Sequence, residues 1–233
     1  NLKVYIEAAK GRGESLDHVL LYGPPGLGKT TMAKIIANEL GSQFKVTSGP
    51  AIARPGELAA ILTTLQEHDV LFIDEIGELD PMMLNKLLKV LEDKRVHFES
   101  AYYDEDAPGI PEYIRKLFKE GAPADFILIG ATTRDPSEIN PAIRSRCAEV
   151  FFDPLQPEHV IEIVNHAAEK LKVHLDDGVA RLISEYTMEG RKAVSLLADA
   201  YGLAVYEKGS ADAPVITRDL MKKTAMASSI SPW

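Results

Sequence analysis

The amino-acid sequence predicts an α/β protein, in which a parallel-sheet domain is followed by a small all-helical domain. Three observations support this prediction. Short, continuous apolar runs alternate with helical patterns over the first two-thirds of the 233 residues. A glycine-rich loop joins the first apolar run to a helical pattern, and after Pro154 only helical patterns follow. Fully apolar strands that are separated by helices are typical of a parallel sheet covered on both faces.

The expected strands share a high content of Val, Ile, Leu and Phe and show little polar alternation. This pattern indicates strands that are buried on both faces, as in the interior of a parallel sheet. They cover residues 18–22, 44–47, 70–73, 126–130 and 150–152.

Helical patterns lie between these strands and fill the rest of the chain. Pro81 directly follows Asp80, an arrangement that is typical of a helix N-terminus. In the last third, Pro157 and Asp176 mark two helix starts, and Thr217 is expected to cap the last helix. The expected helices cover residues 29–40, 56–67, 81–93, 111–119, 157–171, 177–188, 191–207 and 217–227, with no strand among the last four.

The change of pattern after Pro154 predicts two domains. Residues 1–154 are expected to form the α/β domain and residues 155–233 the helical domain. A bundle of about 75 residues has only a small core, so we expect it to dock on its neighbour.

Composition and charge exclude several classes of protein. Hydrophobic residues make up 45% of the chain and charged residues 26%, a globular balance that argues against disorder. The net charge of −9 disfavours non-specific binding to nucleic acid. The single cysteine, Cys147, cannot form an internal disulfide, which fits a reducing compartment. The sequence has no apolar run long enough to span a membrane, so we expect a cytoplasmic protein.

The glycine-rich loop Gly23-Pro24-Pro25-Gly26-Leu27-Gly28-Lys29-Thr30 matches the phosphate-loop pattern G-x-x-x-x-G-K-[ST] in full. It follows an apolar strand and begins a helix, the context that the motif requires, whereas the alternative is an ordinary Gly-Pro turn. Glycines let backbone N–H groups converge on an anion, and the helix N-terminus adds its positive dipole end. We expect Lys29 to neutralise the β- and γ-phosphates of ATP and the Thr30 hydroxyl to bind Mg²⁺. Thr31 completes the expected nucleotide-binding set.

A second motif follows the predicted strand at 70–73, which ends in the two carboxylates of Asp74 and Glu75. From the carboxyl end of the strand, Asp74 can reach the magnesium shell, directly or through water. Glu75 would then orient and polarise the attacking water as a general base. Alone, the pair could equally be two solvated turn acids, but the phosphate loop upstream favours the catalytic interpretation. Asp followed by Glu favours an ATPase that hydrolyses through water.

Two further motifs follow, Ile-Gly-Ala-Thr-Thr-Arg at 129–134 and Arg-Ser-Arg at 144–146. In this order the four motifs resemble those of the AAA+ ATPases, and the helical tail resembles their lid domain. The resemblance covers nearly the whole chain. It implies a P-loop NTPase (AAA+) domain with a lid, ATP or ADP and Mg²⁺ as cofactors, and a homo-oligomeric ring that is expected to be a hexamer.

Different parts of the chain resemble different AAA+ relatives. Residues 1–75, with LDHVLLY, ANELG and TSGPAI, resemble the RuvB-type Holliday-junction branch-migration motor. Residues 72–233, with NKLLKVLE, ESAYY and EGRKAV, resemble the ATPase module of LonB-type ATP-dependent proteases. The sequence therefore favours a chimera of two relatives, joined in the strand that both share.

The resemblance also implies roles for residues outside the first two motifs. Thr133 matches the sensor-1 residue, which helps to hold the attacking water. Arg146 matches the finger arginine of clamp-loader relatives and Arg144 that of the branch-migration motor, so either could reach the γ-phosphate of a neighbouring subunit. Arg191 matches the sensor-2 arginine, a γ-phosphate contact within one chain. The alternatives are strand-end hydrogen bonding for Thr132 and Thr133, a surface ion pair for Arg144 and Arg146, and a solvent-facing helix start for Arg191.

Other candidates receive a plainer interpretation. Tyr22 is expected to pack in the core rather than against adenine. The six histidines show no ligand spacing, and the acidic residues and tyrosines within 99–113 are expected to form a solvated loop. We therefore expect no metal besides Mg²⁺.

The resembled families carry effector domains after the lid: a winged-helix domain that reads DNA, or a Ser–Lys protease domain. We recognise neither in this sequence. We therefore expect no direct nucleic-acid binding, no proteolysis and no membrane partner. Three functions stay open: an active ATPase ring, a folded nucleotide-binding scaffold with little or no turnover, and a fragment of a DNA branch-migration motor.

Overall fold

The computed structural model describes residues 7, 18–98, 104, 106–208, 215–230 and 232. The segment LDHVLLY, which resembles the branch-migration motor, begins before residue 18 and so lies partly outside the described residues. The tyrosine pair at 102–103 lies wholly outside them. The described chain forms two compact units. The first comprises its residues up to Tyr22 and from Lys29 to Phe151, and the second comprises Gly23–Gly28 and its residues from Phe152 onward.

A five-stranded sheet forms the centre of the first unit, with the order β2-β3-β6-β1-β7. All neighbouring strands in it are parallel, as the apolar runs predict. β1, β3 and β6 are almost wholly buried, whereas β2 and β7 at the edges are partly exposed. The strands are β1 (His18–Tyr22), β2 (Phe44–Ser48), β3 (Val70–Asp74), β6 (Ile127–Thr132) and β7 (Cys147–Phe151).

Three motifs meet at one edge of this sheet because they follow the carboxyl ends of neighbouring strands. β1 ends at Tyr22, directly before the phosphate loop, and Tyr22 pairs with Thr132 at the end of β6. β3 ends at Asp74, and its Ile73 pairs with Gly130 of β6. In open parallel sheets, ligands bind outside the carboxyl ends of the strands where the strand order reverses.

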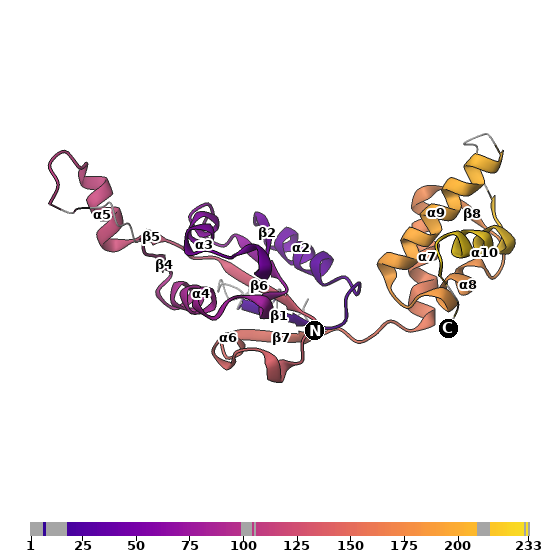
Figure 1. Ribbon diagram of the computed structural model, residues 1–233, viewed down its shortest axis with the longest axis horizontal. Helices are drawn as coiled ribbons and strands as arrows, with labels where there is room; N and C mark the ends of the chain where they lie inside the picture. Colours follow the sequence, from indigo (N-terminus) through magenta and orange to yellow (C-terminus); the bar gives the residue numbers. More distant parts are fainter. Residues whose placement is uncertain are drawn as a thin grey trace. The chain divides into compact units, whose positions relative to one another are not determined.

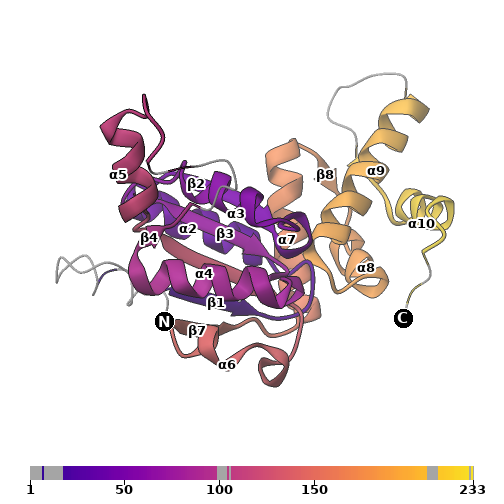
Figure 2. The same ribbon diagram turned by 60° about the vertical axis from the view of Figure 1, so that its left-hand side comes forward.

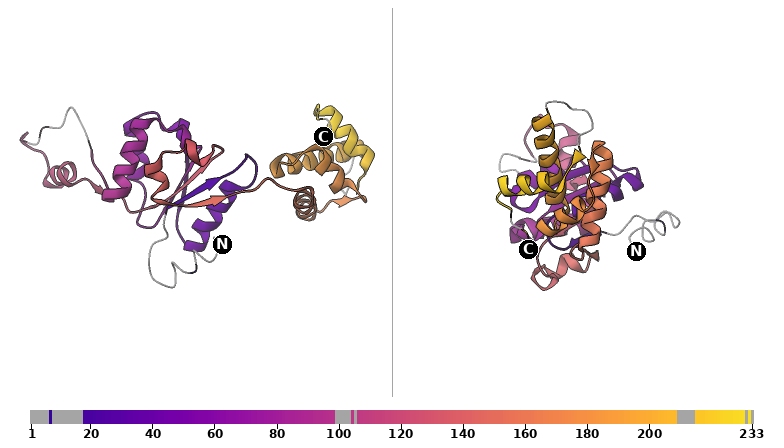
Figure 3. Two further views of the ribbon diagram at one scale, coloured as in Figure 1. Left: turned by 90° about the horizontal axis from the view of Figure 1, so that it is seen from below. Right: turned by 90° about the vertical axis from the view of Figure 1, so that its right-hand side faces the viewer.

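Helices cover both faces of the sheet (Figure 2, Figure 3). α3 (Pro55–Leu62) and α4 (Pro81–Asp93) share one apolar cluster with alternate residues of β1, β3 and β6, because successive strand side chains point to opposite faces. α2 (Lys29–Leu40) contacts β3 and β6 and buries Ala33, Ile36 and Ala37. Fully burying one Leu or Ile side chain contributes about 1.5–3 kcal/mol, so this double covering stabilises the sheet.

Short helices and caps end the strands near the edge that carries the motifs. The single-turn helices η1 (Gly49–Ala51), η2 (Ile76–Glu78) and η3 (Pro136–Glu138) follow β2, β3 and β6. The Asp80 side chain accepts a hydrogen bond from the Met82 amide at 2.8 Å, which confirms the predicted start of α4. α6 (Pro141–Arg144) begins in the same way, after Asn140.

An arm extends from the first unit between β4 (Arg95–Val96) and β5 (Ala122–Pro123), which pair antiparallel at its base. The arm carries α5 (Glu112–Glu120), which has no fully buried residue and projects away from the sheet (Figure 1). Arg95 donates hydrogen bonds to the carbonyls of Glu120 and Gly121 and so satisfies the end of α5.

The second unit has a separate apolar core, to which each of its long helices contributes. Its helices are α7 (Pro157–Leu171), α8 (Val179–Tyr186), α9 (Gly190–Lys208) and α10 (Arg218–Ala227). The Thr217 hydroxyl accepts a hydrogen bond from the Leu220 amide at 3.2 Å, as predicted for the cap of the last helix.

The structure corrects the sequence analysis in several details. The second domain was expected to lack strands, but β8 (His174–Leu175) and β9 (Val215–Ile216) form a parallel pair there. Two-residue strands are too short to produce an alternation pattern. The helix expected at 56–67 ends at Leu62, where turns over Thr63–Leu65 replace it, and the last strand of the sheet covers 147–151 rather than 150–152. Gly178, rather than Asp176, is the N-cap of α8.

Within the described residues, no helix is long and apolar enough to cross a membrane. In the same residues, no group of three or more His, Cys, Asp or Glu side chains could hold a metal ion.

Candidate active site

The phosphate loop connects β1 to α2, and all three of its glycines adopt backbone angles that other residues rarely adopt, with Gly23 at φ +148°. Gly26 has φ +78° and Gly28 has φ +89°. A Cβ at Gly28 would meet nothing within 4 Å, so the left-handed backbone, rather than crowding, explains glycine there. The loop therefore has the conformational freedom that convergent backbone N–H groups require.

Lys29 begins α2, and its side chain is buried, with 8% of the residue exposed. Burial lowers the pKa of Lys29 below its usual value, and the negative charges of Glu75 and Asp74 oppose that shift. A buried ammonium needs anionic partners. The structure thus brings the predicted phosphate-binding lysine beside the two predicted catalytic carboxylates.

Asp74 and Glu75 lie half-buried at the end of β3. The Glu75 amide donates a hydrogen bond to Asp74 Oδ1 at 3.0 Å. Glu75 itself has φ +47° and ψ +50°, the left-handed region that costs a non-glycine residue about 1–3 kcal/mol. Such strain persists only where the surroundings hold it, and it concentrates at functional sites.

The two threonines at the end of β6 differ in exposure. Thr132 is fully buried, and its hydroxyl accepts a hydrogen bond from the Arg134 amide at 3.0 Å. Thr133 is exposed at the same edge of the sheet as Asp74. Strand-end hydrogen bonding therefore applies to Thr132, while the Thr133 side chain is accessible to a ligand.

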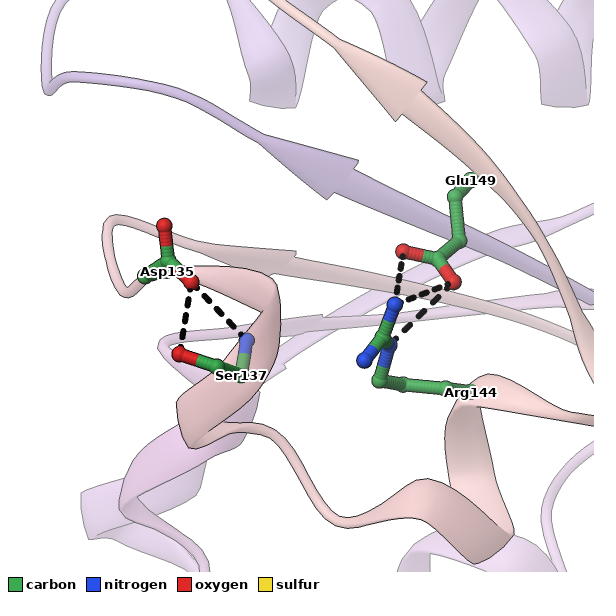
Figure 4. A network of polar contacts seen from close by, with 4 residues as sticks. All are labelled: Asp135, Ser137, Arg144 and Glu149. Atoms are coloured by element: carbon green, nitrogen blue, oxygen red, sulfur yellow. Dashed lines mark hydrogen bonds and ion pairs between the residues drawn. The ribbon is translucent and has the colours of Figure 1, made fainter.

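Arg144 forms an ion pair with Glu149 of β7, with two nitrogen–oxygen hydrogen bonds of 3.2 and 3.4 Å (Figure 4). Its hydrogen bond to Glu149 raises the pKa of the Arg144 guanidinium. Nearby, the Ser137 hydroxyl and amide donate to Asp135 and lower the pKa of that carboxyl (Figure 4). Arg144 is thus held within its own chain by an ion pair, the alternative that the sequence analysis left open, although the sequence did not indicate Glu149 as the partner.

Tyr22 lies beside this ion pair. Its ring is 2% exposed and stacks on Phe151, with centroids 4.9 Å apart and planes 11° from parallel. Among the described residues its hydroxyl has no hydrogen-bond partner within normal geometry. Burial, with the neighbouring Glu149, raises the pKa of Tyr22 to about 12. The expectation that Tyr22 packs in the core is confirmed.

Tyr22→Phe is expected to stabilise the first unit by about 1 kcal/mol near pH 8, because it removes a buried hydroxyl that makes no hydrogen bond of normal geometry to the described residues. The advantage grows above pH 10. The raised pKa means that the native state holds a proton that the unfolded state loses, so stability falls as pH rises from 10.0 towards 12. By pH 11 this adds about 1.4 kcal/mol to the difference. Urea unfolding of both proteins at pH 8 and 11 measures it, with Tyr113→Phe on exposed α5 as the control. An equal response in the two variants would contradict the prediction.

Arg146 is held less firmly than Arg144. One of its nitrogens donates to the Ala142 carbonyl at 2.8 Å, and another lies 3.7 Å from a carboxylate oxygen of Glu92. The Arg144 and Arg146 side chains are each 34% exposed. A group outside this chain can therefore reach both arginines, but each arginine must first leave its partner.

Within the second unit, the start of α9 lies against the phosphate loop. A Cβ at Gly190 would lie 3.6 Å from the Gly26 carbonyl oxygen, and a Cβ at Gly26 would lie 3.4 Å from the Glu189 Cβ. Arg191 is exposed in the first turn of α9, and Glu189 forms an ion pair with Lys192 at 2.8 Å. The predicted sensor-2 residue, Arg191, thus directly follows Gly190, which lies beside Gly26. The sequence analysis did not anticipate the carboxylate of Glu189 there.

The oxygen donors of this edge fit Mg²⁺. Thr30 is half-buried in the first turn of α2, and Asp74 is half-buried at the end of β3. A hydroxyl and a carboxylate are hard ligands of the kind that Mg²⁺ prefers. A magnesium ion that also binds substrate phosphates needs only one or two protein ligands, which these residues supply.

A phosphate loop after the first strand of a parallel sheet, with two carboxylates after a neighbouring strand, defines a P-loop nucleoside triphosphatase. Comparison with known proteins identifies the family. The model of the "Holliday junction DNA helicase RuvB P-loop domain" matches residues 1–151. The chain belongs to this family, and it is an AAA+ P-loop module with both RuvB-like and Lon-like character.

Curated relatives include both kinds of protein that the sequence resembles. "Lon protease 2" of Bacillus subtilis (strain 168) is 39% identical over 84% of this chain and 42% of its own length. The "Holliday junction branch migration complex subunit RuvB" of Bdellovibrio bacteriovorus is 47% identical over 76% of this chain and 50% of its own length. The chain thus spans about half the length of the curated relatives it matches.

Solved structures give the same result. The RuvB Holliday junction branch migration motor of Thermotoga maritima matches with a TM-score of 0.78 and 36% identity over 97% of this chain and 66% of that one. A mutant of the same protein has a TM-score of 0.82 at 36% identity, over 99% of this chain and 69% of that one. These matches support the predicted fold class of a parallel-sheet P-loop domain.

The comparisons also bear on the expected junction near residue 75. The RuvB family model continues to residue 151, well beyond it. The Lon relative covers 84% of the chain, which is more than residues 72–233 contain. Both likenesses therefore span the junction, and an origin as a chimera stays a hypothesis.

Proposed function

We propose that this chain binds ATP with Mg²⁺ and hydrolyses it to ADP and phosphate. The observation that carries the proposal is the burial of Lys29, the lysine of a complete phosphate loop, beside Asp74 and Glu75. A lysine in that position holds the β- and γ-phosphates as a point charge. The buried site strengthens this attraction because it is screened less by water.

Glu75 is the proposed general base. Its carboxylate accepts a proton from a water molecule while the water oxygen bonds to the γ-phosphorus. The bond from that phosphorus to the oxygen of ADP breaks, and phosphate leaves with the second product, ADP. Thr133, exposed at the neighbouring strand end, accepts or donates a hydrogen bond that orients the water. A bound Mg²⁺, held by Thr30 and Asp74, would neutralise the phosphate charge.

We further propose that residues 155–233 act as a lid and that the protein works as a homo-oligomeric ring, expected to be a hexamer. The contact between Gly190 and Gly26 supports the lid, because it links the helical core to the phosphate loop. Arg191 would contact the γ-phosphate from α9. An arginine of the adjacent subunit, Arg144 or Arg146, would complete the site.

The nucleotide site is tested first by binding. Lys29→Ala is expected to weaken binding of a fluorescent ATP analogue about 10- to 100-fold, the loss of one charge-assisted contact to phosphate. Lys34→Ala, exposed on the same helix, is the matched control and should bind like the unchanged protein. Equal affinity in the two variants would rule out the proposed role of Lys29.

A nucleotide-binding scaffold without turnover is the competing function. The observation in its favour is that Arg144 is already paired with Glu149, which leaves the proposed finger engaged within its own chain. Turnover per chain that stays near zero at every protein concentration, with ATP still bound, would establish the scaffold instead.

We also propose that this chain does not itself bind DNA, on the ground of its net charge of −9. Salt-dependent binding to a DNA junction at micromolar protein concentration would overturn this proposal and revive the branch-migration function of the RuvB relatives.

A further inference from the structure

The strained backbone of Glu75 needs external support, and residues from two other strand ends lie against it. Beyond the bond to Asp74, the Glu75 carbonyl accepts a hydrogen bond from the Glu78 amide at 2.9 Å. On the side of β2, Gly49 approaches so closely that a Cβ there would lie 2.3 Å from the Glu75 carbonyl oxygen. Only glycine permits this approach, so the end of β2 fixes the Glu75 turn from one direction.

Arg134 supports the same turn from the side of β6. A Cβ at Gly77 would lie 3.0 Å from Arg134 Cδ, so the arginine stem packs directly on the η2 backbone. The guanidinium forms an ion pair with Glu78 at 2.5 Å. At its other end, the Arg134 amide donates to the Thr132 hydroxyl. Arg134 therefore touches both the turn that carries Glu75 and the strand end that carries Thr133.

The Arg134–Glu78 pair adds little to stability. The two side chains are 37% and 46% exposed, and exposed ion pairs contribute about 0.2–1 kcal/mol. The position of the Arg134 guanidinium is nevertheless well defined. Its side-chain stem packs on Gly77, and its backbone amide donates to the buried Thr132 hydroxyl. A contact that is weak in energy but fixed in place is suited to setting the distance between two groups.

We propose that Arg134 is a positioning residue, which holds the general base Glu75 in register with Thr133 through its ion pair with Glu78. This inference rests on the proposed function of Glu75. Arg134 touches neither nucleotide nor water in this role. Its loss is expected to lower the rate of hydrolysis and to leave ATP binding intact, because a misplacement of about 1 Å in a catalytic group can cost about 100-fold in rate.

The test measures kcat, the KM for ATP and the melting temperature of Arg134→Ala. We expect kcat to fall about 10- to 100-fold with KM within about twofold and an unchanged melting temperature. Arg134→Lys should recover part of the rate, and the exchange Glu78→Arg with Arg134→Glu should recover most of it. Lys94→Ala is the matched control, because Lys94 forms an ion pair of 3.6 Å with Asp125 at the base of the arm.

Hydrogen exchange gives a readout that does not depend on activity. The Glu78 and Leu79 amides close the turn after Glu75, and they should exchange about 2- to 5-fold faster in Arg134→Ala than in Lys94→Ala. Unchanged exchange, or a kcat equal to that of the control in an active protein, would overturn the role of Arg134 alone. An unaltered chain without turnover under any condition would instead overturn the proposed hydrolysis and this inference with it.

Discussion

Glu75→Gln is expected to lower ATP turnover about 100- to 10,000-fold and to leave ATP binding unchanged. The amide has the size of the carboxylate but cannot accept the proton of the attacking water. Binding should be unaffected because, in the proposed site, the loop, Lys29 and Mg²⁺ hold the phosphates rather than Glu75. The measurement is steady-state phosphate release beside the affinity for a fluorescent ATP analogue.

The control for this variant is Glu67→Gln, since Glu67 is exposed shortly before β3 and its substitution makes the same chemical change. The expected pattern, loss of kcat at constant affinity, is the signature of an interaction made only in the transition state. Turnover that equals that of the control would remove Glu75 from the mechanism. A parallel loss of affinity would indicate instead that the neutral side chain disturbs Lys29, whose buried charge faces Glu75 and Asp74.

The central fold was predictable because its signals are local. Residues 70–73 are uniformly apolar, and β3 covers Val70–Asp74. Asp80 and Pro81 mark the start of α4 to the residue. The phosphate loop is recognisable because its glycines and lysine are consecutive, so strand, loop and helix are specified within one short segment.

The surroundings of the site were not predictable, because they join residues that are far apart in the chain. Gly49 approaches Glu75 across the ends of β2 and β3, and Arg134 reaches Glu78 over 56 positions. No periodicity reports such a pairing. The left-handed backbone of Glu75 leaves no trace in the sequence either, since glycine, Asn or Asp would normally mark it. The structure is therefore needed to show which residues hold the motif residues in position.

The second large effect is expected at Arg144 and Arg146. Turnover per chain should rise with protein concentration, and alanine at the arginine that serves as the finger should lower it about 1,000-fold or more. The measurement is phosphate release over a concentration series, with sedimentation to follow assembly. A rate that is independent of concentration and insensitive to both substitutions would exclude a finger that acts between subunits.

The contacts of the two arginines separate a catalytic role from a structural one. Arg144→Ala leaves Glu149 without its partner beside the buried Tyr22, so its melting temperature is expected to fall whether or not it is the finger. Among the described residues, Arg146→Ala loses a carbonyl contact and a 3.7 Å pair with Glu92, so its melting temperature should hold. A loss of turnover in Arg146→Ala can therefore be attributed to chemistry directly.

Mixing two inactive variants provides the decisive measurement. If the finger acts on a neighbour, a ring that contains Glu75→Gln subunits and finger-variant subunits has some interfaces with an intact Glu75 on one side and an intact arginine on the other. Turnover should then reappear on mixing, although each variant alone is inactive. An arginine that acts within its own chain cannot be supplied by a partner. A mixture as inactive as its components would therefore exclude Arg144 and Arg146 as fingers that act between subunits, and would remove the chemical argument for a ring.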